Sequence, residues 1–345
     1  MTDKTKDADR ETAEAKMIEE QDWTFDHGTR FEDYEIIRRI RSSRNWITVL
    51  AENSTGDRKA LTYIDKSKII ERYQMWAFQN GTPPDDLEKE AFEYLHDHQE
   101  KLKEAVDRVK GLECGHVATI HRYSYDREKD QLVIVSDFTP GVDIFEACRM
   151  LNWKQILYLF TQVLEGLREI HEFQFLHLNL KPSRIFVDFS PKVPSVMLSD
   201  FGFAVPVKGY AEKYNGTLFY MAPEVILEER DKIDYRADLF SFGVTFYYCL
   251  TGNQPFGDRF IAQSDKQRIL NHVKREKNIS TPPSFYRKEL PPELDEFLMG
   301  LLQKEPEERK YKRAKGALNY IETNWPDECK TMTREGSTTL MSYDD

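Results

Sequence analysis

The chain has 345 residues, of which 40% are hydrophobic and 32% are charged, and its formal net charge is −11. This length suits a fold of one or two domains with a sizeable core. The acidic balance excludes general nucleic-acid binding, which depends on a surplus of Lys and Arg.

Two further features of the composition concern the cellular compartment. The charged N-terminus lacks the apolar stretch of a signal peptide, and the most apolar run, 239–250, is too short to span a bilayer. The four cysteines (Cys114, Cys148, Cys249 and Cys329) show no metal-ligand or redox spacing. We therefore expect a soluble, cytoplasmic protein whose reduced thiols serve as packing residues.

The N-terminal part of the chain changes character near Tyr34. Residues 1–30 are polar and acidic, which predicts a flexible tail. Three short runs rich in β-branched and aromatic residues follow at 34–37, 46–50 and 59–64, with polar turns between them. This pattern predicts an antiparallel meander.

A long, highly charged segment, 66–113, comes next and is interrupted at 81–84 by Gly-Thr-Pro-Pro. Its apolar residues recur at helical spacing, so one long helix or two shorter ones would fit. These residues are Leu87, Ala91, Tyr94, Leu95, Leu102, Ala105, Val106 and Val109. Two further strands are predicted at 118–125 and 131–138.

Beyond Gly141 the pattern is mainly helical, with an amphipathic helix predicted at 153–173 and a buried helix at 239–250. The predicted fold class is α+β, with a small β-rich lobe followed by a larger helical lobe. We expect a flexible N-terminal tail at 1–30, a first lobe with an acidic helical insertion at 31–138, a helical lobe at 139–327 and a flexible C-terminal tail at 328–345.

Five short segments follow one another in the order and at the separations found in the protein kinase superfamily. They are His-Leu-Asn-Leu-Lys-Pro-Ser-Arg-Ile at 177–185, Asp-Phe-Gly at 200–202, the loop 216–224 ending in Ala-Pro-Glu, Asp-Leu-Phe-Ser-Phe-Gly at 238–243, and Arg309. The resemblance covers about residues 34–325 and implies a bilobal kinase-like fold. Residues 200–224 resemble the AGC group within an AGC/CaMK-like pattern, with Lys213 at the place of an activating phosphothreonine.

The resemblance also implies structural roles for several of these segments. The loop 177–185 takes the place of the kinase catalytic loop, and Asp238 belongs to a buried helix that supports it. Arg309 stands where kinases place the arginine that pairs with the glutamate of Ala-Pro-Glu, here Glu224. These residues are expected to stabilise the second lobe.

The segment that resembles the catalytic loop departs from the kinase pattern at the positions that take part in phosphotransfer. Asn179 stands at the position of the catalytic aspartate, which accepts the proton of the substrate hydroxyl. Arg184 replaces the asparagine that holds a second magnesium ion, and Leu178 replaces the arginine that anchors a phosphorylated activation loop. Lys181 is retained and could still face a phosphate. Phosphotransfer therefore loses a base and a metal ligand.

The first lobe has lost its phosphate-binding residues as well. Arg41, Ser43 and Trp46 take the places of the three glycines that let the backbone lie close over phosphates. Trp46 either fills the nucleotide cleft or packs on its neighbour in an ordinary turn. Thr62 stands at the position of the phosphate-binding lysine, and Lys59 falls on the opposite strand face.

Several positions are left with two interpretations. Arg41 or Arg44 could supply a substitute cation for the missing lysine. Asp200 either binds magnesium or is a hydrogen-bonded turn residue without a metal. The lysine's partner on the following helix is Glu104 or, with a shift of one residue, Ala105, and we expect Glu104 to be a solvated charge.

The remaining site residues are expected at the connection between the lobes. Ser136 takes the place of the gatekeeper residue, and Phe138 belongs to a hinge at 136–139. With Trp46, Ser43 and Arg41 they complete the set of nucleotide-contacting positions that the resemblance implies. No cofactor is certain, and ATP with magnesium is at most a weak ligand.

The leading hypothesis is a pseudokinase that acts as a binding, scaffolding or allosteric regulatory module in intracellular signalling. Its partners would be proteins, such as an active kinase or the substrate of one, with no nucleic acid and no membrane span. The alternatives are a residual Ser/Thr protein kinase with an unconventional ATP site, or a nucleotidyl transferase on the same fold. The acidic insertion, 73–113, either covers the small lobe or contacts a partner, or is a solvated pair of charged helices.

Overall fold

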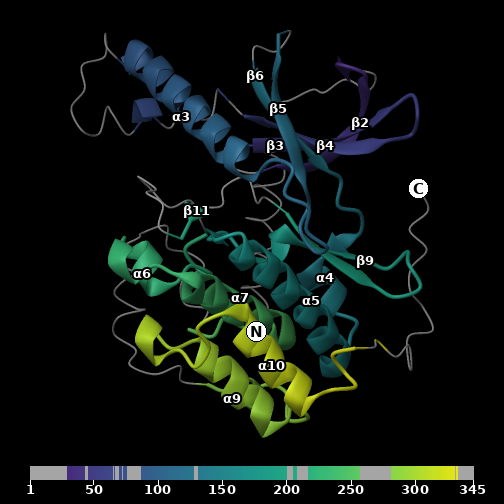
Figure 1. Ribbon diagram of the computed structural model, residues 1–345, viewed down its shortest axis with the longest axis vertical. Helices are drawn as coiled ribbons and strands as arrows, with labels where there is room; N and C mark the ends of the chain where they lie inside the picture. The colour runs from purple at the N-terminus through teal and green to yellow at the C-terminus, as the bar shows by residue number, and fades with distance from the viewer. Residues whose placement is uncertain are drawn as a thin grey trace, which may run out of the picture. The chain divides into compact units, whose positions relative to one another are not determined.

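The computed structural model describes residues 29–42, 46–64, 66, 70–71, 73–75, 87–127, 131–199, 205–207, 217–256, 281–330 and 332. They belong to two compact units. The first consists of Met1–Gly111 and Ile120–Phe138, and the second of Leu112–Thr119 and Thr139–Asp345. Strands dominate the described part of the first unit and helices that of the second, which confirms the α+β class (Figure 1).

The first unit contains a six-stranded antiparallel sheet with the strand order β1-β2-β3-β4-β6-β5. Its strands are β1 (Arg30–Phe31), β2 (Tyr34–Ser42), β3 (Trp46–Asn53), β4 (Arg58–Ile64), β5 (Ile120–Asp126) and β6 (Gln131–Asp137). The predicted meander is confirmed. The two-residue strand β1 was not predicted, because a pair of residues carries no periodicity.

A polar turn joins β3 to β4 and shows how the sequence ends one strand and begins the next. The side-chain Oδ1 of Asn53 accepts hydrogen bonds from the backbone N–H groups of Thr55 and Asp57, at 3.0 and 2.9 Å. Gly56 has a φ of +82°, which glycine adopts without strain. Apolar side chains of the sheet then form one buried cluster, which comprises Phe31, Tyr34, Ile36, Ile47, Val49, Ala51, Leu61, Tyr63, Val133 and Val135.

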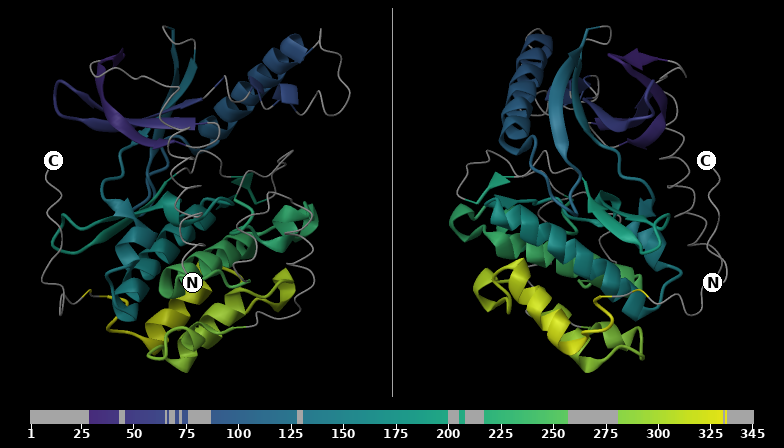
Figure 2. Two further views of the ribbon diagram at one scale, coloured as in Figure 1. Left: turned by 180° about the vertical axis from the view of Figure 1, so that it is seen from behind. Right: turned by 45° about the vertical axis from the view of Figure 1, so that its right-hand side comes forward.

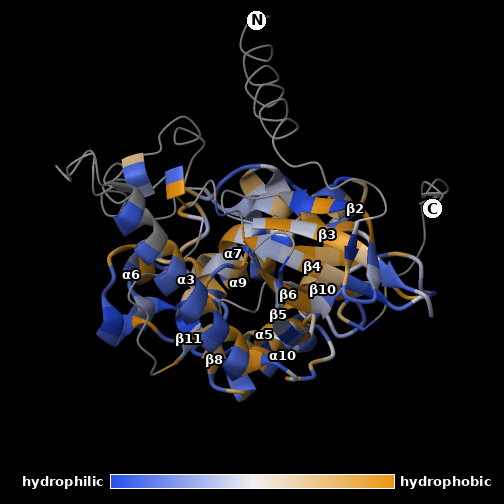
Figure 3. Cartoon of the chain, turned by 90° about the horizontal axis from the view of Figure 1, so that it is seen from above, coloured by the Kyte–Doolittle hydropathy of each residue, from blue (hydrophilic) through white to orange (hydrophobic). Residues whose placement is uncertain are grey.

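Helix α3 (Leu87–Val109) is one continuous helix of 23 residues. The interruption at 81–84 lies outside the described residues. Leu95, Leu102, Val106 and Val109 are buried, as the 3.6-residue period requires. The rest of the helix is mostly hydrophilic (Figure 3), with exposed ion pairs one turn apart such as Asp97–Lys101 at 2.7 Å. The helix therefore has both a packed face and a solvated charged face.

The second unit is built mainly from helices (Figure 2). Its larger elements are α4 (Ile144–Cys148), α5 (Trp153–Glu172), α6 (Pro223–Ile226), α7 (Tyr235–Thr251), α9 (Pro292–Leu301) and α10 (Ala314–Asn324). Its 3₁₀ turns are η1 (Pro182–Arg184), η3 (Arg230–Lys232), η5 (Pro283–Phe285) and η6 (Pro306–Glu308). Its short strands are β7 (Val142–Asp143), β8 (Phe175–Leu176), β9 (Ile185–Asp188), β10 (Ser195–Leu198) and β11 (Val205–Pro206).

Both predicted helices of this unit are present. The helix predicted at 153–173 corresponds to α5, and the helix predicted at 239–250 lies within α7. A capping box of Asn152 and Gln155 begins α5, because each side chain satisfies a backbone N–H that the helix leaves without a partner. Helix α7 ends at Gly252, which has a φ of +71°. Most residues of α7 are buried.

Residues Leu112–Thr119 pack with the second unit, although we expected them in the first lobe. Val117 forms a parallel bridge with Leu198 of β10. The backbone N–H of Ala118 donates to the oxygen of Leu198, and the N–H of Leu198 donates to the oxygen of His116, both at 2.8 Å. Main-chain pairing therefore attaches this segment to β10.

The four cysteines are free thiols, of which Cys148, Cys249 and Cys329 are buried and Cys114 is partly buried. Burial raises the pKa of the Cys249 thiol well above its usual value, and contact with the Cys148 thiol raises it further. Cys148, Cys249 and Cys329 therefore pack in the interior, as expected of thiols that serve as packing residues. None of the helices in the described part of the chain combines the length and apolarity needed to cross a membrane.

Candidate functional site

The loop 177–184 is held from below by the buried carboxylate of Asp238, near the start of α7. Backbone N–H groups of His177 and Leu178 donate to its two oxygens at 2.8 and 2.7 Å. The Nε2 of His171, at the end of α5, lies 3.0 Å from Oδ2. Burial by itself would raise the pKa of Asp238, but the hydrogen bond and charge of His171, with the charge of His177 and the Leu178 N–H, hold that pKa below its usual value.

Leu178 combines a strained backbone with a buried side chain. Its φ is +55°, in the left-handed region that a leucine adopts at a cost of about 1–3 kcal/mol. The bond from its N–H to Asp238 holds this conformation. The side chain belongs to a buried cluster that also includes Leu176, Met221 and Phe240. The residue that replaces the expected arginine therefore adds to the core instead of projecting a charge.

A second set of contacts connects the loop to the end of strand β10. The Nε2 of His177 lies 3.2 Å from the backbone oxygen of Ser199, and the N–H of Ser199 donates to the backbone oxygen of Arg184 at 2.8 Å. The N–H of Asn179 donates to Nδ1 of His177 at 3.2 Å. Asn179 and Arg184 are both partly exposed. The loop backbone is therefore fixed at both ends, with Asn179 between the anchors.

Lys181 binds a residue far away in the sequence. Its Nζ donates to Oγ1 of Thr217 at 2.7 Å, and both side chains are partly buried. Leu218, Phe219 and Tyr220 follow Thr217 and pack against the cluster that contains Leu178. The substrate-side loop of the kinase resemblance is thus hydrogen-bonded to the loop 177–184.

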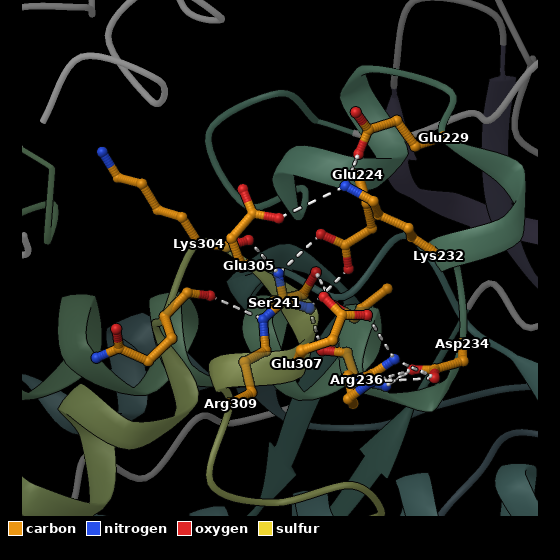
Figure 4. Close-up of polar contacts among 12 residues, drawn as sticks. Glu224, Glu229, Lys232, Asp234, Arg236, Ser241, Lys304, Glu305, Glu307 and Arg309 are labelled. Atoms are coloured by element: carbon orange, nitrogen blue, oxygen red, sulfur yellow. Dashed lines mark hydrogen bonds and ion pairs between the residues drawn. The ribbon is translucent and has the colours of Figure 1, made fainter. Parts of the chain in front are cut away.

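The predicted pair of Glu224 and Arg309 is confirmed (Figure 4). The Nη1 and Nη2 groups of Arg309 donate to the two carboxylate oxygens of Glu224 at 2.6 and 2.7 Å, and both residues are buried. Arg309 also donates to the backbone oxygens of Gln303, Lys304 and Arg236. Every donor nitrogen of the guanidinium therefore has an acceptor, as a buried charge requires.

In the first unit, Thr62 lies at the centre of the sheet. It pairs with Thr48 of β3, and their hydroxyl oxygens are 3.0 Å apart. Ala60 lies on the same face and pairs with Ser136 of β6, which is partly buried, as is Phe138. At the position where kinases carry the phosphate-binding lysine, β4 therefore has the hydroxyl and methyl groups of Thr62.

The cations near Thr62 lie in different directions. Lys59 is on the opposite face of β4, and its Nζ is 3.3 Å from Oδ1 of Asp57 and 3.4 Å from Oδ1 of Asp137. Arg41 of β2 pairs with Thr48, which pairs with Thr62, so these three residues form one cross-strand row. Residues of such a row share a face, and two strand spacings separate Arg41 from Thr62 by about 10 Å.

Trp46 begins β3 opposite Ile64 and is partly buried. Two residues separate it from Thr48 along the strand, so it shares the face that carries Thr62. Glu104 of α3 is exposed, as expected of a solvated charge. Neither residue forms part of the buried cluster of the sheet.

The predicted positions that lie outside the described residues include Ser43, Arg44, Asp200 and Lys213. Among the residues that are described, no group of three or more His, Cys, Asp or Glu side chains is arranged to hold a metal ion. The described residues closest in sequence to Asp200 are Ser199, whose contacts are given above, and Val205 of β11.

Sequence reasoning missed three residues of this site: Thr48, His171 and Ser199. Thr48 could have been found, because an antiparallel register between 46–50 and 59–64 brings it opposite Thr62. His171 acts through a carboxylate 67 residues away, and Ser199 through its backbone, so no local pattern marks either of them.

Comparisons with known proteins agree with this arrangement. The family model described as the protein kinase domain matches residues 89–320. The serine/threonine-protein kinase ULK3 of Rattus norvegicus is 30% identical over 215 residues, which are 61% of this chain and 43% of that protein. The mitogen-activated protein kinase kinase kinase 3 of Arabidopsis thaliana is 30% identical over 217 residues, 61% of this chain and 31% of that protein.

The chain thus spans less than half the length of these curated relatives. Among solved structures, the PknI kinase domain of Mycobacterium tuberculosis has a TM-score of 0.58 at 18% sequence identity. The match covers 87% of this chain and 99% of that domain. At this identity the likeness establishes the fold, a β-sheet lobe with a helical lobe, as expected from the motifs.

Proposed function

Because this chain belongs to the protein kinase family, we propose that it is a member with impaired phosphotransfer that acts as a binding, scaffolding or regulatory module. Asn179 carries this proposal. Its amide takes the place of the aspartate in a loop that Asp238 and Ser199 hold in place. An amide cannot accept the substrate proton, and a general base contributes about 10²–10⁴-fold in rate.

Thr62 supports the proposal independently. A kinase uses a lysine at this position to hold the nucleotide phosphates. Here the hydroxyl of Thr62 is in contact with that of Thr48, and Lys59 is committed to Asp57 and Asp137 on the other face. Weak ATP binding follows from these contacts, and the replacement of the three glycines at 41–46 acts in the same direction.

Phosphotransfer from radiolabelled ATP to a mixed protein substrate tests the proposal. We expect no transfer above background and no rise in the thermal midpoint at millimolar ATP with magnesium. The matched comparison is the triple variant Thr62→Lys, Asn179→Asp, Arg184→Asn, which restores the kinase residue at each position and is expected to gain transfer. Robust transfer by the native chain that is lost in Asp200→Ala would contradict the proposal.

One observation favours a second candidate, residual Ser/Thr kinase activity. Arg41 lies in the same cross-strand row as Thr62 and could supply the missing positive charge to a nucleotide. The hydrogen bond between Lys181 and Thr217 also leaves the substrate side of the loop assembled. The relative ULK3 named above is a serine/threonine-protein kinase, which is consistent with this candidate.

The variant Arg41→Gln separates the two candidates, with Arg38→Gln as its control. Arg38 lies on the same strand and is exposed. If residual transfer exists and depends on Arg41, only the first variant loses it. Intact-mass measurement after incubation with ATP covers nucleotidyl transfer, for which the described residues add no argument.

The proposal also includes the protein's binding partners and its cellular location. A kinase-like protein without strong phosphotransfer would act by binding proteins, such as an active kinase or a substrate of one, in the cytoplasm. The resemblance to the AGC group rests on residues 200–224, most of which lie outside the described residues.

A further inference from the structure

The turn between β9 and β10, residues 189–194, presents a serine that is followed by a proline. Figure 1 shows the chain after β9 projecting away from the helices of its unit. Asp188 and Ser195 form the last pair of the ladder, so the turn lies beyond the paired strands. Residues 190–193 are all exposed, and the exposed fraction of Val193 is 52%. Another protein can therefore reach four successive residues of this turn.

The backbone of the turn is held in place, whereas the hydroxyl of Ser190 is not engaged. The N–H of Ser190 donates to Oδ1 of Asp188 at 2.9 Å, the contact by which an aspartate fixes the residue two positions later in a turn. Pro191 disfavours helical backbone at Ser190 and favours an extended one. Within the described part of the chain, the Ser190 hydroxyl has no hydrogen-bond partner. It can therefore react without breaking a contact of the fold.

Burial distinguishes Ser190 from similar positions. Four serine or threonine residues of the chain are followed by proline, and Thr82 is the one of them that lies outside the described residues. Thr139 is only 5% exposed. Thr281 is partly buried, and its backbone oxygen accepts from the hydroxyl of Tyr247 at 2.8 Å. Of the three described positions, Ser190 is the exposed one.

The proline identifies the class of modifying enzyme. Proline has no backbone N–H and a fixed φ, so the enzyme must accept proline directly after the reacting residue. We propose that Ser190 is phosphorylated by a proline-directed serine/threonine kinase. The Oγ of Ser190 bonds to the γ-phosphorus of ATP, and the bond from that phosphorus to the β–γ bridging oxygen breaks. ADP leaves, and the hydroxyl proton passes to the base of the acting kinase.

The fold tolerates a phosphate at this position. The added charge is about −1.5 to −2. Lys192 lies two residues later, is exposed, and forms no ion pair with any described residue, so it can compensate part of that charge. Ser190 is outside the paired strands, which therefore keep their hydrogen bonds. This inference does not depend on the proposed function.

The test compares the native chain with peptides that have no fold. The full chain is incubated with ATP, magnesium and a proline-directed serine/threonine kinase, and mass spectrometry measures the occupancy of each site. Synthetic peptides centred on Ser190, Thr139 and Thr281 are treated identically, and each is expected to react. In the native chain we expect Ser190 to react at least about tenfold faster than Thr139 and Thr281, because a buried site reacts only when the chain opens locally.

Three outcomes would overturn the proposal. The first is a native chain that stays unmodified at Ser190 while its peptide reacts, because the fold would then hide the serine. The second is a Ser190 peptide that does not react either. The third is a native chain in which Thr139 or Thr281 reacts as fast as Ser190.

Substitutions locate the site. Ser190→Ala should abolish incorporation at this turn, and Pro191→Ala should keep the hydroxyl and slow the reaction about tenfold. Ser54→Ala is the control, since Ser54 is exposed in the β3–β4 turn, is followed by threonine, and should not matter. The substitution of Pro191 in the synthetic peptide measures the effect of proline apart from the shape of the turn. An undiminished rate there would contradict a proline-directed enzyme.

Incubation without added kinase keeps the result distinct from the test of the proposed function. Incorporation at Ser190 under that condition would contradict both a separate kinase and impaired catalysis. An unmodified Ser190 in the presence of the kinase would overturn this inference and leave impaired catalysis intact.

Discussion

In the helical unit, the positions that kinases use to support the fold keep their charged residues. On one face of β3 and β4, by contrast, the lysine expected of a kinase is absent and two threonine hydroxyls meet. Asp238 is fully buried and gathers three donors, and Glu224 and Arg309 form a buried bidentate pair. Thr62 instead shares a hydrogen bond with Thr48.

The difference follows from what each charge does. A buried charge with several partners cannot be removed without leaving those partners unsatisfied, so the fold depends on it. A charge meant for a phosphate has its partner in the ligand, so the folded chain does not need it. The positions that support the loop were retained here, and those that perform chemistry were replaced.

The largest effect is expected from breaking the buried ion pair with Arg309→Met. Glu224 would be left as a buried charge without its partner, at a cost of about 3–5 kcal/mol in the free energy of unfolding. Urea unfolding measures this cost. The control is Glu296→Gln, because the pair of Glu296 with Lys310 is largely exposed and solvent screens its attraction. Similar losses in both variants would contradict the comparison.

A smaller loss, about 2–3 kcal/mol, is expected for Asp238→Asn. The remaining oxygen becomes a neutral acceptor, and the NH₂ group that replaces the other oxygen cannot accept from the backbone N–H that faces it. The folded pKa of Asp238 lies below its unfolded value, so its stabilisation is present above a pH of about 3.9 and is lost as the pH falls through the folded pKa. Unfolding measured from neutral pH into this acidic range should show the two proteins converging. A constant difference would mean that the charge of Asp238 contributes nothing.

The smallest loss of stability is expected at the pair of Thr48 and Thr62, which stands where the phosphate-binding charge is missing. Thr62→Val leaves the buried hydroxyl of Thr48 without this partner and should cost about 1 kcal/mol. The double variant Thr48→Val, Thr62→Val removes both hydroxyls and should be close to neutral. A double variant that loses as much as the sum of the singles would show that the two hydroxyls do not act together.

The sequence alone determined the order of the lobes, most strands and helices, and the places of Asn179, Thr62, Arg184, Glu224 and Arg309. Such features are local: hydrophobic periods reveal the elements, and short motifs keep their spacing. The partner of Arg309 could be named because the motif of Glu224 identifies both ends of the pair.

Only the tertiary structure decided what the replacing side chains do. Leu178 enters a core cluster and Thr62 meets Thr48, because residues far apart in sequence come together there. Arg41 shares a row with Thr62 only through a register that shifts between Arg39 and Arg41, and an irregularity of that kind has no periodic signal. Strand register and core packing depend on the whole fold, and that is why the local pattern left these contacts open.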